Sequence, residues 1–194
     1  MMNNNTKKVL VLAHPDDEVL WFNSGIGYDK IYFVFLDNPA SSKPLKEGRL
    51  KVIEKHPFKN KIEMLGLTES NYWKDNSNEN ESKYRQNLDD IVRKLKTVVT
   101  RDTEFWTHNL WGEYGHADHS LVHRAVVEIA EKFGLPVYCY NGIAKIDLPK
   151  SQIIYKNLDR NIYEGLRSLY LREKVWTYDL KYKPDDKLEY YKIL

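Results

Sequence analysis

The side chains best suited to chemistry gather in two short runs, of which the first reads Ala-His-Pro-Asp-Asp-Glu over residues 13–18. It follows an apolar run at residues 8–12, which predicts a buried strand. One imidazole, His14, and two carboxylates, Asp16 and Asp17, can together hold a divalent metal and leave one carboxylate free as a base. The alternative is an ordinary turn that uses proline and aspartate for their turn chemistry.

The second run reads Gly-His-Ala-Asp-His-Ser over residues 115–120. His116 and His119 are spaced i, i+3, which at the start of a helix places both imidazoles on one face. Three imidazole or carboxylate ligands plus a water form an open, catalytic zinc site. His123 lies four residues beyond His119 and is an alternative ligand. The two runs together favour a metal-dependent enzyme over a turn.

Taken together, AHPDDE after the first strand and the later GH-x-DH resemble the motifs of the PIG-L/LmbE-like family of zinc-dependent N-deacetylases. The order and spacing fit over roughly residues 1–145. The resemblance implies a set of ligands for zinc, with Fe²⁺ as an alternative ion: His14, Asp17 and His119. It also implies that Asp16 is the general base and that His116 stabilises the oxyanion. Asp118 would then orient His116 and keep it charged.

The same resemblance implies a hydrolase that removes an acetyl group from an N-acetylated sugar or sugar conjugate of the N-acetylglucosamine type. An amidase acting on a non-sugar amide or a thiol conjugate is an alternative. A non-catalytic sugar- or metal-binding protein is an alternative of a different class. The intact Asp16 argues against that class, because a purely structural metal site needs no base.

The chain departs from the family's pattern near the expected pocket. Bulky residues occupy positions 19–25, where many members have a glycine-rich stretch, which predicts a different or narrower pocket. Ala117 replaces the usual proline, and Val52 stands where the usual Arg-x-x-Glu pattern has its acid. Rings and polar groups suit sugar faces and hydroxyls, so four residues are candidate substrate contacts: Arg49, Trp111, Glu113 and Tyr114. The two aromatic residues could instead simply pack their loop.

Alternating strands and helices must position these residues. Periodicity and turn signals predict strands at 8–13, 30–36, 61–65, 103–108 and 136–140, and helices at 17–28, 46–56, 83–99 and 116–133. This alternation predicts an α/β fold: a Rossmann-like, doubly wound, mostly parallel sheet with helices on both faces. In the strand order 3-2-1-4-5 the first and fourth strands are neighbours, so both motifs meet at the switch point. No Gly-x-Gly-x-x-Gly follows the first strand, which argues against a dinucleotide site.

The composition frames these predictions. With 194 residues, 42% of them hydrophobic, the chain is expected to form a single domain over 1–194 with a sizeable core. Residues 1–7 are expected to be a flexible tail and 74–82 a polar surface loop. Residues 150–194 are expected to hold a strand at 152–156, a helix at 158–176 and a tyrosine-rich tail packed on the domain.

Charge and cysteine content bear on partners. The net charge of +2 gives no reason to expect nucleic acid, and no apolar run is long enough for a membrane span. A single cysteine, Cys139, fits a reducing compartment, so a cytoplasmic location is expected. The expected partner is a small-molecule N-acetyl sugar or conjugate, and the oligomeric state is left open.

Overall fold

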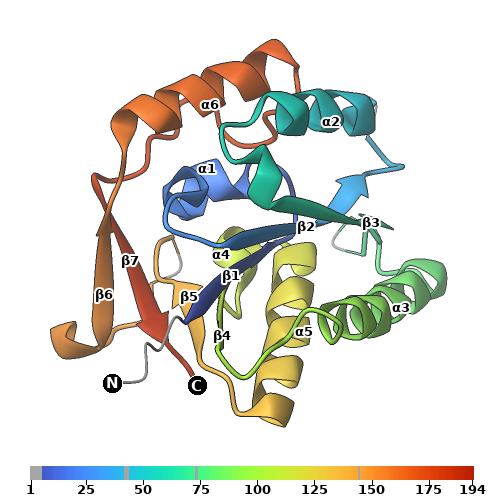
Figure 1. The fold of residues 1–194 in the computed structure, drawn as a ribbon. Coiled ribbons are helices and arrows are strands. Elements are labelled where there is room, and N and C mark those ends of the chain that lie inside the picture. The colour runs from blue at the N-terminus through green and yellow to red at the C-terminus, as the bar shows by residue number, and fades with distance from the viewer. Residues whose placement is uncertain (1–5, 42–43, 73, 144) are drawn as a thin grey trace.

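One sheet runs through the computed structural model, which describes residues 6–41, 44–72, 74–143 and 145–194 (Figure 1). Within these residues seven strands pair in the order β3-β2-β1-β4-β5-β7-β6. Their bounds are β1 (Lys7–Leu12), β2 (Lys30–Asp37), β3 (Ile62–Thr68), β4 (Thr103–Thr107), β5 (Val137–Tyr140), β6 (Ile153–Asn157) and β7 (Lys187–Lys192). The first five are parallel and stand in the predicted order.

Helices cover both faces of this sheet, as expected for a doubly wound fold. Figure 1 shows α1 (Asp17–Trp21), α2 (Leu45–Lys55) and α6 (Arg160–Arg172) over one face. The helices α3 (Asn78–Leu95) and α5 (Ala117–Phe133) lie against the other. A single turn, α4 (Gly112–Gly115), precedes α5. No helix in the described part of the chain is both long and apolar enough to cross a membrane.

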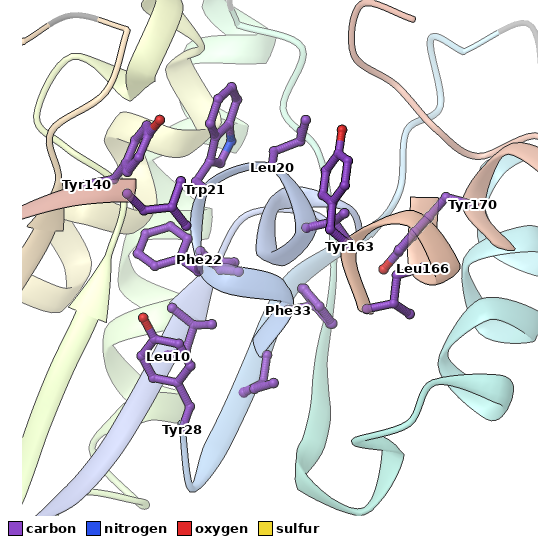
Figure 2. Close-up of a cluster of buried hydrophobic side chains, with 14 of the residues drawn as sticks. Leu10, Leu20, Trp21, Phe22, Tyr28, Phe33, Tyr140, Tyr163, Leu166 and Tyr170 are labelled. Atoms are coloured by element: carbon purple, nitrogen blue, oxygen red, sulfur yellow. The ribbon is translucent and has the colours of Figure 1, made fainter. Parts of the chain in front are cut away.

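Two cores form because strand residues point alternately to opposite faces. On β1, Leu10 and Leu12 enter one cluster while Val9 and Val11 enter the other. Figure 2 shows the first cluster, in which Trp21 and Phe22 lie over the sheet and Tyr163, Leu166 and Tyr170 of α6 approach from the side. Since both faces of β1 are buried from Val9 to Leu12, this part of the strand is apolar throughout, as parallel strands usually are.

Two sequence predictions about local structure need correction here. The helix expected at 17–28 ends at Trp21, because Asn23 and Ser24 have positive φ angles of 48° and 56°, which an α-helix does not contain. The polar segment 74–82 is not all loop, since α3 begins within it. Ser77 caps that helix, and its Oγ accepts a hydrogen bond from the Asn80 backbone at 3.5 Å.

The chain ends also differ from expectation. Lys7 already belongs to β1, and residues 1–5 of the expected tail lie outside the described residues. The helix expected at 158–176 is α6, capped by Asp159 and shorter at both ends. The tyrosine-rich tail contains an unexpected strand, β7, which runs antiparallel between β5 and β6. Between α6 and β7, the connecting segment 173–186 returns to the ends of the parallel strands, where Thr177 contacts Asp16.

Candidate active site

Both sequence motifs meet at the carboxyl ends of β1 and β4, as the strand order requires. His14, Asp16 and Asp17 follow β1 directly, while His119 stands in the first turn of α5. The imidazole rings of His14 and His119 have centroids 5.2 Å apart. Because β1 and β4 are paired, residues far apart in sequence converge at the switch point of the sheet.

Three side chains are spaced as metal ligands are. His14 Nδ1 lies 3.3 Å from His119 Nε2 and 3.6 Å from Asp17 Oδ2, and His119 Nε2 lies 3.5 Å from Asp17 Oδ1. Ligands about 2.0–2.1 Å from a tetrahedral zinc ion stand about 3.3 Å from one another. His14, Asp17 and His119 therefore fit a divalent metal.

Neighbouring side chains widen the choice of donors. His116 comes close enough to form a group with His14 and His119, and His108 forms one with Asp17 and His119. In both groups the candidate ligand atoms lie within 4.8 Å of one another. The donor set is rich in imidazole. Imidazole nitrogens are good ligands for zinc and iron, whereas magnesium and calcium prefer oxygen ligands.

A buried glutamate fixes two of these histidines. Glu113 Oε2 accepts hydrogen bonds from His119 Nδ1 at 2.7 Å and His108 Nδ1 at 2.9 Å. This arrangement leaves the Nε2 atom of His119 with a lone pair toward His14 and Asp17. Burial alone would raise the pKa of Glu113, but His108 and His119 outweigh it and lower that pKa to about 2. Glu113 is thus an ionised support behind the donors and, being fully buried, does not reach the cavity as a substrate contact.

A second carboxylate, Glu69, lies on the other side of His14. Its Oε1 atom lies 3.4 Å from His14 Nε2 and 3.4 Å from Arg49 Nη1. Arg49 also donates to the Leu36 carbonyl at 3.1 Å. Sequence reasoning missed Glu69, although it directly follows β3 at the same edge of the sheet. Glu69 pairs with Arg49, whereas Val52 of the expected motif lies fully buried in the core.

The pKa values of the two adjacent aspartates of the first motif are shifted in opposite directions. Burial, followed by the neighbouring charge of Asp17, raises the pKa of Asp16 well above its usual range. Burial also acts on Asp17, but His119 and His108 outweigh it and hold its pKa well below the usual range. Asp17 is therefore suited to bind a cation, and the raised pKa makes Asp16 the stronger base of the two.

His116 caps α5 and is oriented by the backbone of Asp118. The Asp118 N–H donates to His116 Nδ1 at 3.2 Å, so the proton of a neutral ring sits on Nε2. Burial, with His119 and His14 nearby, lowers the pKa of His116 below its usual range. The Asp118 carboxylate accepts from Ser70 Oγ at 3.3 Å. The structure thus favours a neutral His116, in contrast to the charged form expected from the sequence.

Beside these residues opens a cavity of about 410 Å³. Two of the four predicted substrate contacts, Arg49 and Tyr114, line it, together with His14, Asn38, Leu45, Glu69, Gly115, His116, Thr177, Tyr178 and Asp179. Trp111 is 56% exposed and does not line it. The rings of Tyr114 and Tyr178 have centroids 5.2 Å apart and form an aromatic wall.

The two remaining buried histidines have structural partners. His123, the alternative ligand, lies 2.8 Å from the His108 carbonyl through Nδ1. The sequence suggests that His56 is a surface helix end, but the structure buries it with Nε2 3.6 Å from Glu18 Oε1. Glu18 in turn accepts from Tyr170 Oη at 2.7 Å and from the Asp16 backbone at 3.0 Å.

Comparison with known families agrees with this geometry. The family described as PIG-L, GlcNAc-PI de-N-acetylase, matches residues 9–130, which include both motifs. The chain belongs to the PIG-L family. Among curated proteins, uncharacterized protein L374 of Acanthamoeba polyphaga mimivirus is 26% identical over 137 residues, which are 63% of this chain. The chain spans 57% of the length of that relative.

Solved structures with the same fold include deacetylases of glycopeptide biosynthesis. The zinc-inhibited form of teicoplanin deacetylase Orf2 is 14% identical, with a TM-score of 0.66 over 96% of this chain and 97% of that one. The A40926 pseudoaglycone deacetylase Dbv21 is 13% identical, with a TM-score of 0.63 over 96% of both chains. At these identities the likeness establishes the fold of this PIG-L protein and not its substrate.

Proposed function

We propose that this PIG-L protein is a metal-dependent hydrolase that removes the acetyl group from an N-acetylated sugar or sugar conjugate. The observation that carries the proposal is the close approach of three side chains next to Asp16: His14 Nδ1 lies 3.3 Å from His119 Nε2, and each of these nitrogens lies 3.5–3.6 Å from one oxygen of Asp17. Family membership and the deacetylases that share the fold support the reaction class. Zinc is the preferred ion because two of its three donors are imidazoles.

His14, Asp17 and His119 would hold the ion, which when bound polarises the acetyl carbonyl and lowers the pKa of water. Asp16 Oδ1 would take the proton of the water that adds to the carbonyl carbon. The Nε2–H of His116 would donate to the carbonyl oxygen as it becomes negative. As the C–N bond breaks, Asp16 would return its proton to the departing nitrogen, leaving acetate and a free amine.

The cavity walls support a sugar as the acyl carrier. Tyr114 and Tyr178 offer aromatic faces, while Asn38, Glu69 and Asp179 offer groups that can pair with hydroxyls. A ring with one apolar face and a polar rim matches this combination. The cavity is open to solvent beside Asp179, which is exposed, so a conjugate larger than one sugar could extend outward.

The test is acetate release from a panel of N-acetyl sugars, sugar conjugates and non-sugar N-acetyl amides. The purified chain is assayed after chelation and again after addition of Zn²⁺ or Fe²⁺. The proposal expects release from a sugar substrate that is lost on chelation and restored by metal. Release only from non-sugar amides would show that the substrate is not a sugar. No release from any metal-loaded sample would contradict the proposal.

A further inference from the structure

We propose that Thr177, a residue outside the family match, is a positioning residue that holds the carboxylate of Asp16 in place as the proton acceptor. This inference rests on the proposed deacetylase function. Thr177 lies in the connecting segment 173–186, between α6 and β7, and lines the cavity. No motif of the sequence points to it.

The contact between the two residues is made through a single oxygen. Asp16 Oδ2 accepts hydrogen bonds from the Thr177 backbone N–H and from Thr177 Oγ1, both at 2.8 Å. The other oxygen, Oδ1, is buried and accepts no hydrogen bond from the described residues. Two donors on Oδ2 fix the plane of the carboxylate, and Oδ1 is left to accept the proton.

The backbone of Asp16 needs such support because it is strained. Its φ angle is 106°, in a region that non-glycine residues rarely adopt. The Asp16 N–H donates to Glu18 Oε2 at 3.0 Å, and Tyr170 of α6 donates to Glu18 Oε1 at 2.7 Å. Thr177 therefore completes a clamp in which one end of Asp16 is held by Glu18 and the other by the segment after α6.

A purely structural role for Thr177 would tie the segment to the domain without affecting the chemical step. The two roles differ in what Thr177→Val does to turnover. Valine keeps the shape and the backbone N–H but removes Oγ1, so the carboxylate loses one of its two donors. Since the hydrogen bond is to a charged group, we expect kcat to fall about tenfold or more. KM should change less, because the defect lies in the chemical step.

The kinetic test uses the full-length, metal-loaded protein and three variants. Thr177→Val should lower kcat, and Thr177→Ser should recover most of it because serine restores the hydroxyl. Thr97→Val is the matched control, since Thr97 lies in the connection between α3 and the start of β4 and, among the described residues, its hydroxyl bonds the Lys94 carbonyl. Equal kcat in wild type and Thr177→Val, or a serine variant no better than valine, would overturn the proposal.

A second measurement does not depend on activity. A double-mutant cycle of Thr177→Val with Asp16→Ala compares free energies of unfolding, and direct contact predicts that the two changes are not additive. Thr97→Val with Asp16→Ala should be additive. Additivity in the first cycle would overturn the Thr177 contact. If the wild type releases no acetate, the proposed function fails while the cycle still decides whether Thr177 holds Asp16.

Discussion

The parallel part of the sheet and its antiparallel edge contribute to the site in different ways. The proposed metal donors and the proposed base follow β1 and β4, in the segments and first helical turns after the ends of those strands. The C-terminal region, from β6 to β7, supplies no candidate metal donor within the described residues. Its Tyr170 instead contacts Glu18, which holds the Asp16 backbone, and its Thr177 contacts the Asp16 carboxylate. In the proposed mechanism the parallel region therefore supplies the reacting groups, and the C-terminal region holds them in position.

The largest effect should come from the base supplied by the parallel region. Asp16→Asn is nearly isosteric but cannot accept the proton from water, so turnover should fall by about 10²–10⁴-fold. Metal content should stay at the wild-type level, because Asp17 is the proposed ligand. Steady-state kinetics with metal analysis check both expectations. Loss of metal from this variant would instead assign Asp16 as a ligand.

Much of the parallel region could be predicted from the sequence alone. Apolar runs separated by helical periodicity predicted β1 to β5, and the doubly wound arrangement supplied their order. With that order, the two motifs bring His14, Asp17 and His119 to one crevice. The antiparallel edge was harder, because the six residues of β7, Lys-Leu-Glu-Tyr-Tyr-Lys, show no regular alternation of apolar and polar residues. Such a strand is specified by the partners it finds in β5 and β6 rather than by its own pattern.

Site residues outside the motifs were missed for a related reason. Glu69 and Thr177 act through long-range contacts, of which the one between Thr177 and Asp16 spans 161 positions. Nothing in the local sequence around Thr177 signals that contact. Glu113 was found, but its burial behind His108 and His119 depends on a positive φ of 58° that the sequence does not announce.

The next largest effect should come from His116. Removing a donor to a developing oxyanion costs about 10²–10³-fold in turnover, so His116→Ala should lose activity on that scale. The metal should remain bound, since His119 is the proposed third ligand. Metal analysis of both histidine variants tests this assignment. If His116→Ala loses the ion and His119→Ala keeps it, the two imidazoles have exchanged roles.

A smaller effect is expected from the support behind the donors. Glu113→Gln keeps the shape but replaces one of the two accepting oxygens with an NH2 group, so the side chain cannot accept from His119, His108 and the Asn109 N–H at once. Loss of such a partner typically lowers metal affinity by about 10–100-fold. Competition with a chelator of known affinity measures the metal affinity, and Glu131→Gln, at an exposed position, is the control. Equal affinity in the two variants would mean that Glu113 does not tune the site.

The smallest effect on turnover is expected from Tyr170 in the C-terminal region, whose contact acts on the stability of the fold. Tyr170→Phe removes the hydroxyl that donates to the buried Glu18. A buried charged acceptor left without one donor costs about 1–3 kcal/mol, so the free energy of unfolding should fall by that amount. Urea denaturation checks it, with the exposed Tyr155→Phe as the matched control. A strong loss of bound metal with unchanged stability would contradict the separate roles proposed for the two regions.

Bound metal tests the central claim most directly, namely that His14, Asp17 and His119 form one metal site. Wild-type protein, His119→Ala and His123→Ala are purified identically, and divalent ions per chain are counted by mass spectrometry. The account predicts about one ion per chain in the wild type and in His123→Ala, and a large loss in His119→Ala. Equal metal in the wild type and His119→Ala would contradict it.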